Sequence, residues 1–354
     1  MKMPVEVPVS MKAFVKTERK YGAVEFMDVP KPEPKGDQIL IKIRAAAICG
    51  SDLHAYEYPP GYEFMNVPVI LGHEYGGIVE SVGSEVALFK PGERVMGESN
   101  QYCSKCQNCH EGRTNICISS KMTGLHINGA MAEYILVPEK IVHRIPEGVS
   151  FAEAALAQPC AVSFHAVFDR SEIKPGNVVI VFGPGIVGLM AAKGAQIVGA
   201  SKIFIAGTNV DEAVRLPLAR EMGFIPLNAE TQNLSEEIEK VTGSKLVDVA
   251  IECSGATPAA QATLSLVRKG GSVTLLGIYS KPNEVFFTQF VRNEININTS
   301  YTCLWENYEQ ALQLVASKHV DLKPLIAAYP FEQGLQAIQD GLSKMVIKPV
   351  LLLE

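Results

Sequence analysis

Three kinds of signal are missing from this sequence, and each absence excludes a class of protein. No apolar run approaches the roughly 20 residues that cross a bilayer. The formal net charge is -6, so there is no basic excess that would suit a nucleic-acid backbone. The segment from Met1 to Ser10 has neither a continuous apolar core nor a cleavage site, unlike a signal peptide. We therefore expect a cytoplasmic protein that binds neither membranes nor nucleic acid.

Internal repeats and low-complexity tracts are also absent. What is present is an ordinary globular composition, with 47% apolar and 20% charged residues among 354. A chain of this length can bury a large core without disulfides, and its length favours about two domains.

The first half of the chain carries the patterns of short β-strands. Residues 38–44 alternate apolar and polar side chains, as a half-buried strand does. Residues 69–82 and 93–96 are further candidates for short strands, with Gly and Pro between them. Many short strands separated by turns indicate a partly closed β-barrel.

After about residue 150, helical patterns alternate with strands rich in Val and Ile. This alternation predicts an α/β unit with a parallel sheet that is covered on both faces. A helix is expected over 308–317, and a last strand over 347–352 could return to the first domain. The predicted strands of the parallel sheet are 178–182, 203–206, 247–252, 272–277 and 295–298.

Four of the eight cysteines form one cluster, C-x2-C-x2-C-x7-C. In a reducing compartment such a cluster favours metal binding over disulfides. Four thiolates can surround one tetrahedral ion at about 2.3 Å, and such a closed site is structural. We favour zinc, because this lobe has no second redox motif, and the alternative is an iron–sulfur cluster. The four residues are Cys103, Cys106, Cys109 and Cys117.

A second candidate metal site combines Cys49, in the segment CGSDLH, with His73 and Glu74, in the segment GHE. Alone, a cysteine is usually a small buried residue and a histidine is usually satisfied by hydrogen bonds. Together the three supply a thiolate, an imidazole and a carboxylate, and they leave one position open. A catalytic zinc ion needs such an open position.

A glycine-rich G-x-G-x-x-G motif follows the predicted strand 178–182 and opens a predicted helix from 186 to about 198. A lone match is weak, but this strand–turn–helix context is the one that dinucleotide binding requires. The glycines allow a tight turn, and the helix N-terminus favours the pyrophosphate charge. The expected cofactor-binding residues of the motif are Gly183, Pro184, Gly185, Ile186, Val187 and Gly188.

These motifs, in this order across nearly the whole chain, resemble the zinc-containing medium-chain dehydrogenases, in particular their polyol (sorbitol) and threonine dehydrogenase branch. The resemblance implies a GroES-like β-barrel catalytic domain formed by residues 1–163 and 302–354. Its structural zinc lobe would lie at about 100–120. Residues 164–301 would form a Rossmann dinucleotide-binding domain.

The resemblance also implies that Cys49, His73 and Glu74 bind the catalytic zinc ion. Polyol-type members often carry an acid where this chain has Gln158, and ethanol-type members bring a thiolate from a position near Cys160. The fourth ligand therefore stays open between water, Gln158 acting through water, and Cys160. We favour water.

By the same resemblance, Ser51 would hydrogen-bond the reacting hydroxyl and His54 would pass its proton to solvent. Asp52 would support the metal-bound histidine. Ordinary loop capping is the alternative for Ser51 and Asp52. His165 is expected to be a packed helix residue rather than a ligand.

Selectivity between NAD and NADP is open in the sequence. No acid ends the second strand of the Rossmann unit, where Thr208 stands, although Asp211 follows shortly. Arg215 matches a basic position near the adenosine ribose in some polyol dehydrogenases. The resemblance further places residues 252–255, and Gly277 at the end of the next predicted strand, beside the nicotinamide. Two zinc ions per chain and NAD or NADP are thus the expected cofactors.

The expected substrate is a polar secondary alcohol: a sugar alcohol, cyclitol or sugar. Residues 52–57 (DLHAYE) look like threonine dehydrogenases, which makes L-threonine the alternative substrate. Residues 300–305 look more like sorbitol dehydrogenases, yet Ser300 stands where those enzymes typically have a substrate-contacting Arg. A non-catalytic dinucleotide-binding protein is the alternative of another class, and the intact ligand set argues against it. We expect a homodimer or homotetramer formed through the edge strand 295–298.

Overall fold

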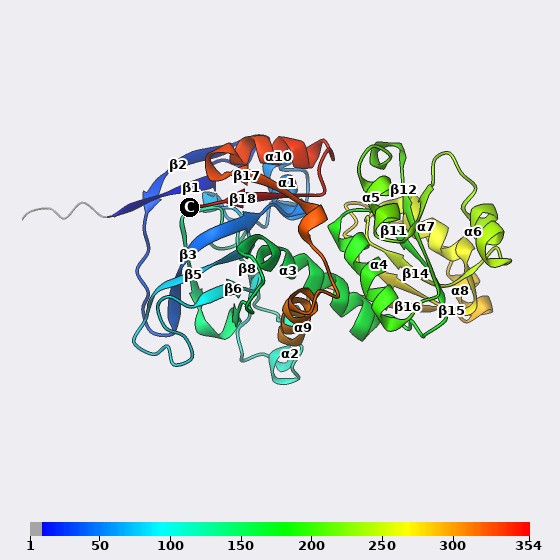
Figure 1. Ribbon diagram of the computed structural model, residues 1–354, viewed down its shortest axis with the longest axis horizontal. Helices are drawn as coiled ribbons and strands as arrows, with labels where there is room; N and C mark the ends of the chain where they lie inside the picture. The colour runs from blue at the N-terminus through cyan, green and yellow to red at the C-terminus, as the bar shows by residue number, and fades with distance from the viewer. Residues whose placement is uncertain (1–8) are drawn as a thin grey trace, which may run out of the picture. The chain divides into compact units, whose positions relative to one another are not determined.

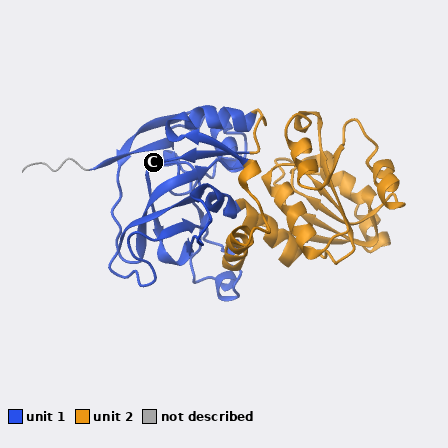
Figure 2. Cartoon of the chain, in the orientation of Figure 1, with its two compact units in different colours: residues 1–158, 326–342, 348–354 blue, residues 159–325, 343–347 orange. Residues whose placement is uncertain are grey.

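The computed structural model describes residues 9–354, so most of the segment Met1–Ser10 lies outside the described residues. The chain divides into two compact units (Figure 2). Unit 1 comprises residues 1–158, 326–342 and 348–354, and unit 2 comprises residues 159–325 and 343–347. The domain limits expected at 163 and 301 stay a prediction; in this division residues 302–325 group with unit 2.

Unit 1 is built from sheets of short strands that pair antiparallel, except for the parallel pair β17 and β18 (Figure 1). A three-stranded sheet has the order β2-β1-β4, and a larger sheet has the order β10-β6-β5-β3-β18-β17, with β9 also paired to β3. A two-stranded ribbon pairs β7 with β8. The strands are β1 (Ser10–Lys16), β2 (Val24–Pro30), β3 (Gln38–Ala47), β4 (Val69–Ile70), β5 (Glu74–Val82), β6 (Arg94–Gly97), β7 (Asn100–Gln101), β8 (Lys121–Met122), β9 (Tyr134–Pro138), β10 (Val142–Arg144), β17 (Ile326–Pro330) and β18 (Lys348–Leu352).

The central strand of unit 1 is β3, whose alternating side chains build the core. Ile39, Ile41 and Ile43 are fully buried and pack with Ile135 and Val137 of β9. Burying each such side chain contributes about 1.5–3 kcal/mol. The stretch 69–82 is two strands rather than one, because the chain passes at residues 71–73 from the three-stranded sheet, which holds β4, to the larger sheet, which holds β5.

The last strand of the chain returns to unit 1, as the sequence suggested it could. β18 pairs antiparallel with β3, with Val350 opposite Ala47. This pairing joins segments about 300 residues apart.

Unit 2 contains a six-stranded sheet in the order β13-β12-β11-β14-β15-β16, and all its pairs are parallel. β15 begins earlier than expected and ends at Leu275, so Gly277 lies in the loop that follows it. The chain order reverses between β11 and β14, and ligands bind outside the carboxyl ends of parallel strands at such a reversal. The strands are β11 (Val178–Phe182), β12 (Lys202–Gly207), β13 (Ile225–Asn228), β14 (Val247–Glu252), β15 (Val267–Leu275) and β16 (Asn296–Thr299).

Helices connect these strands, and α4, α5 and α7 pack against the sheet of unit 2 (Figure 1). The α-helices are α1 (Gly50–Glu57), α2 (Gln107–His110), α3 (Phe151–Phe164), α4 (Ile186–Val198), α5 (Arg215–Glu221), α6 (Leu234–Thr242), α7 (Thr257–Leu266), α8 (Phe287–Asn293), α9 (Trp305–Ala316) and α10 (Gly334–Leu342). A π-helical stretch, His165–Arg170, continues α3. His165 is buried there with its Nδ1 2.9 Å from Asp169 Oδ2, as expected of a packed helix residue. Among residues 9–354, no helix has the length and apolarity needed to cross a bilayer.

Candidate active site and metal centres

The register of two strands explains how Cys49, His73 and Glu74 meet. β3 and β5 pair with Ala47 opposite Glu74. Cys49 follows β3 by two residues and His73 immediately precedes β5, so this register brings both to the same end of the sheet. One ligand atom from each of the three side chains lies within 4.8 Å of the others. The structure therefore brings together the three ligands expected for the catalytic metal.

Asp52 fixes the two loops that carry these side chains. Its buried carboxylate accepts hydrogen bonds from the backbone N–H of Cys49 (2.8 Å) and of Gly72 (3.0 Å). Its Oδ1 also lies 3.9 Å from His73 Nδ1. Asp52 thus caps the start of α1 and supports the histidine at the same time. The two interpretations of Asp52 from the sequence, loop capping and support of His73, are therefore compatible.

Lys348 is a member of this cluster that the sequence reasoning missed. Its Nζ lies 2.7 Å and 2.5 Å from the two carboxylate oxygens of Glu74, and both side chains are buried. The pairing of β18 with β3 delivers this lysine from the far end of the chain. The signal that could have found it is a lysine at the start of an otherwise apolar terminal strand, KPVLL.

The charges of the cluster favour a divalent cation. A thiolate at Cys49 and the carboxylates of Asp52 and Glu74 carry three negative charges, and Lys348 offsets one. Burial lowers the pKa of His73, but the charges of Asp52, Cys49 and Glu74 raise it to about 9 in total. Burial disfavours the charged form of Asp52 as well, and for a carboxyl group this raises the pKa. The donor set thus fits a zinc ion, whose two positive charges would balance the cluster and whose binding would displace a proton from the imidazole.

The first helix carries the two residues expected to handle the substrate proton. Ser51 Oγ lies 3.5 Å from His73 Nε2. His54 is three residues further along α1, so it lies on the same side of the helix. Its side chain is 57% exposed, and its Nδ1 lies 3.4 Å from Glu57 Oε2. One residue is thus at the metal-ligand cluster and the other is open to solvent.

The two residues considered for a fourth ligand are both buried in α3. Gln158 donates through Nε2 to Ser99 Oγ at 3.2 Å. Cys160 is fully buried and belongs to unit 2. The fourth ligand stays a prediction.

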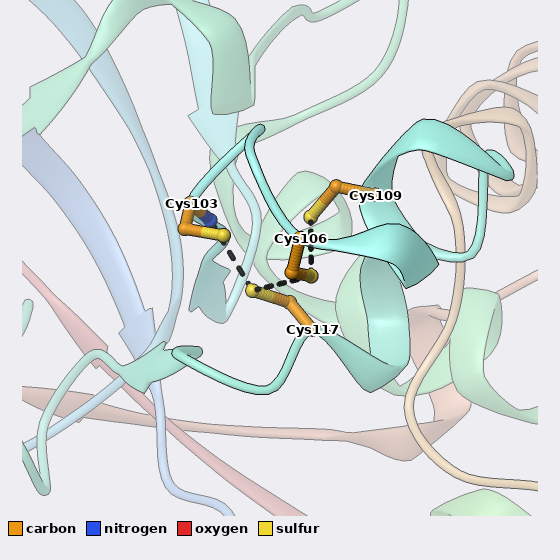
Figure 3. Close-up of side chains that lie close together, drawn as sticks. All are labelled: Cys103, Cys106, Cys109 and Cys117. Atoms are coloured by element: carbon orange, nitrogen blue, oxygen red, sulfur yellow. Dashed lines mark hydrogen bonds between the residues drawn. The ribbon is translucent and has the colours of Figure 1, made fainter.

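The four clustered cysteines converge from one lobe of unit 1 (Figure 3). Cys106 Sγ lies 3.5 Å from Cys109 Sγ and 3.9 Å from Cys117 Sγ. Sulfurs bound to one tetrahedral zinc at about 2.3 Å would lie about 3.8 Å apart. Backbone N–H groups of Cys109 and Ile118 lower the pKa of Cys106 to about 6. The spacing and the backbone N–H groups both suit a metal-bound thiolate.

The glycine-rich turn lies between β11 and α4, where the motif predicted it. Gly183 has a φ of +95°, and a Cβ on Gly188 would lie only 1.9 Å from the Gly183 carbonyl oxygen. Gly185 is the N-cap residue of α4 and has no side chain that could bond the first N–H groups of the helix. A Cβ at Gly185 would meet nothing within 4 Å. The turn is therefore tightly packed on one side and open at the helix N-terminus, as a pyrophosphate requires.

The carboxyl end of β12 is occupied by the chain's own carboxylates. The N–H of Thr208 donates to Asp211 Oδ2 at 3.0 Å, and the N–H of Asn209 donates to Glu230 Oε2 at 2.8 Å. Arg215 Nη1 lies 3.4 Å from Asp211 Oδ1. Asp211 comes a few residues after the end of β12 in sequence. A short 3-10 turn brings it back to the strand end.

Comparisons with known proteins agree with this architecture. Residues 35–147 match the alcohol dehydrogenase GroES-like domain, and residues 187–317 match the zinc-binding dehydrogenase domain. A sorbitol dehydrogenase of Halalkalibacterium halodurans is 33% identical over 96% of this chain and 100% of its own length. An L-threonine 3-dehydrogenase of Yersinia pestis is 34% identical over 95% of this chain and 99% of its own length. A zinc-binding dehydrogenase of Sinorhizobium meliloti 1021, crystallised with NADP, superposes with a TM-score of 0.89 at 29% identity and covers 98% of this chain and 100% of its own.

The chain belongs to the zinc-binding alcohol dehydrogenases, with a GroES-like domain and a Rossmann-type domain. It is a zinc-dependent enzyme that oxidises or reduces alcohols with NAD(P). The resemblance identified from the sequence motifs is therefore confirmed, and so are the expected fold class and the expected zinc and nicotinamide cofactors.

Proposed function

We propose that this enzyme transfers a hydride between a polar secondary alcohol and NAD, and that the alcohol is a sugar alcohol, cyclitol or sugar. The convergence of Cys49, His73 and Glu74 beside Ser51 carries the proposal. These three residues would hold the catalytic zinc, which supplies Lewis-acid activation of the substrate oxygen when bound. Sorbitol dehydrogenases of Halalkalibacterium halodurans and Bacillus subtilis, 33% and 36% identical to this chain, support the substrate class.

In this proposal, the residues of α1 move the proton. Ser51 would hydrogen-bond the alcohol hydroxyl and take up its proton, and the exposed His54 would release that proton to solvent. Asp52 and Lys348 would hold His73 and Glu74 in position, because each is buried and directly contacts its partner. The Gly-rich turn from Gly183 to Gly188 would hold the pyrophosphate. Gly277 would lie near the nicotinamide, and so would Glu252, the last residue of β14.

We propose NAD rather than NADP because of the anions at the end of β12. A 2′-phosphate needs free N–H donors or unpaired cations, yet the N–H groups of Thr208 and Asn209 already donate to Asp211 and Glu230. Arg215 Nη1 is paired with Asp211, and its buried Nε has no hydrogen-bond partner. The ribose hydroxyls of NAD can instead donate to these carboxylates. The carboxylates would repel the additional phosphate charge of NADP.

We also propose that the Cys103, Cys106, Cys109 and Cys117 lobe holds a structural zinc ion and that the enzyme works in the cytoplasm as a homodimer or homotetramer. The edge position of β16 supports the oligomer, because Ile297 is exposed on it and Phe286, Phe287 and Val291 are exposed nearby in sequence. Light scattering of the protein and of an Ile297→Lys variant tests it: a wild-type monomer would contradict the proposal.

The second candidate substrate is L-threonine, because residues 52–57 and the 34% identity to L-threonine 3-dehydrogenases favour it. One experiment separates the candidates: a panel of polyols, cyclitols, sugars and L-threonine, each with NAD and with NADP, followed by the absorbance of reduced nicotinamide. We expect the highest kcat/KM for a polyol or sugar with NAD. Preference for L-threonine would replace the substrate, and preference for NADP would overturn the cofactor assignment. Dinucleotide binding without any turnover would indicate the non-catalytic alternative.

A further inference from the structure

A fully buried carboxylate lies at the carboxyl end of β14, and neither the zinc chemistry nor the glycine-rich turn uses it. Glu252 Oε1 accepts hydrogen bonds from the Ser254 N–H (2.7 Å), from the Ser254 hydroxyl (2.5 Å) and from the Gly255 N–H (3.2 Å). Its Oε2 accepts from the Tyr279 hydroxyl at 2.7 Å and from the same Gly255 N–H at 3.1 Å. A buried charge costs several kcal/mol unless it is paired or hydrogen-bonded. The four donors around Glu252 offset this cost.

These bonds connect two loops that follow neighbouring strands. The Ser254 and Gly255 donors belong to the loop after β14, and Tyr279 belongs to the loop after β15. The backbone N–H of Leu276 and of Gly277 also donate to the carbonyl oxygen of Glu252, at 2.8 Å and 3.0 Å. Glu252 therefore binds both loops through its side chain and its backbone.

Gly277 shows how closely the two loops approach each other. A Cβ on Gly277 would lie 2.2 Å from Glu252 Oε2 and 2.3 Å from the Gly255 nitrogen. Any larger residue would therefore push the loops apart. Side-chain packing adds little at this point, because Ile278 is 76% exposed. Hydrogen bonds to Glu252 therefore anchor the first residues of the loop after β15.

The joined loops lie next to the glycine-rich turn. The Cys253 N–H donates to the carbonyl oxygen of Phe182, the last residue of β11, at 3.0 Å. A Cβ on Gly183 would lie 3.0 Å from the Ser254 Cβ. The reversal of strand order falls between β11 and β14, so these loops line the crevice where a dinucleotide binds.

We propose that Glu252 is a positioning residue for the dinucleotide: it fixes the loops after β14 and β15 as a rigid wall for the nicotinamide half of the cofactor. This inference rests on the proposed dinucleotide site. The adenine half would bind at the end of β12, on the other side of the glycine-rich turn. Loss of Glu252 therefore weakens binding of the whole dinucleotide but not of AMP, which occupies the adenine half alone.

Four variants of the zinc-loaded chain test this role by calorimetric Kd values for NAD and for AMP. Glu252→Ala removes the acceptor of all four donors. Tyr279→Phe removes the side-chain link between Glu252 and the loop after β15 and leaves the carboxylate three donors. Glu252→Gln keeps an oxygen for the backbone donors and an amide that can donate to the Tyr279 hydroxyl. The matched control is Asp248→Asn, at the opposite end of the same strand, where Asp248 accepts from the Val178 N–H and from Arg268 Nε.

Glu252→Ala should raise the Kd for NAD about tenfold or more, and Tyr279→Phe about threefold, with AMP within about twofold of wild type. Glu252→Gln should fall between Glu252→Ala and wild type, and Asp248→Asn should change neither Kd. Unchanged NAD binding, or equal loss of NAD and AMP binding, overturns the proposal. If Glu252→Ala does not fold, Tyr279→Phe decides by the same two Kd values. A wild-type chain that binds no NAD would overturn the dinucleotide site itself, which distinguishes the two failures.

Discussion

The buried pair of Lys348 and Glu74 gives the sharpest prediction about the metal centre. Lys348→Met keeps much of the side-chain volume and removes the charge that faces the carboxylate at 2.5–2.7 Å. Removing one partner of a buried ion pair costs about 3–5 kcal/mol, because the other charge is left unpaired. Total stabilities are about 5–15 kcal/mol, so the zinc-free variant should be clearly less stable.

Zinc changes the size of this effect, because a cation bound by Glu74 also neutralises its charge. We expect Lys348→Met to destabilise the zinc-loaded chain by about 2 kcal/mol less than the zinc-free chain. By linkage, the same difference appears as tighter zinc binding, about 30-fold at 2 kcal/mol. Glu74→Gln removes the negative partner instead. It should also destabilise the zinc-free chain, since Lys348 is left unpaired, but it should weaken zinc binding.

The assay combines urea unfolding followed by circular dichroism with competition for zinc against a chelator. Metal analysis counts the zinc ions that stay bound to the chain. It thus shows whether the chelator has emptied the Cys49–His73–Glu74 site or the four-cysteine lobe. The two variants must shift zinc affinity in opposite directions while both lower the stability of the zinc-free chain. The double variant Glu74→Gln/Lys348→Met should recover part of the lost stability. Two shifts of zinc affinity in the same direction, or wild-type stability for Lys348→Met, would refute the reasoning.

Three further outcomes are expected. Cys49→Ser should abolish alcohol oxidation while the Kd for NAD changes by less than about twofold, because the thiolate lies in the metal cluster and not in the Rossmann sheet; turnover at the wild-type rate would contradict the zinc mechanism. Cys106→Ser should lower zinc from two ions to one per chain and lower the Tm, since a closed thiolate site tolerates no missing ligand; metal analysis and calorimetry measure both. Burial lowers the pKa of Lys16 from 10.5 to about 8, so only the unfolded chain binds this proton between those pH values. This contribution to stability is fully present above about pH 10.5 and is lost as the pH falls to about 8, so Lys16→Met should reduce the rise of stability between pH 8 and 10 in urea unfolding; an unchanged slope would contradict this.

Some features of the fold were predictable because their signals are local. Residues 178–182 and 247–252 are strands with the predicted bounds, and the helix after the glycine-rich turn runs from Ile186 to Val198. Uninterrupted Val and Ile runs predict buried parallel strands wherever the rest of the chain lies. The predicted strand over 69–82 was wrong as a single element, because the chain passes from one sheet to another at residues 71–73, where His73 lies.

By itself the sequence determined the residue types that can hold metal and phosphate: the cysteine spacing, the cysteine and histidine–glutamate motifs, and the glycines of the turn. Their chemistry depends on side-chain identity and short spacings, which are visible without coordinates. Only the tertiary structure decided which distant groups complete these sites. Lys348 reaches Glu74 across 274 positions through the pairing of the last strand, and Tyr279 reaches Glu252 from the loop after the next strand. Both contacts depend on strand order and register, which are set by burial over the whole fold and leave no mark in local spacing.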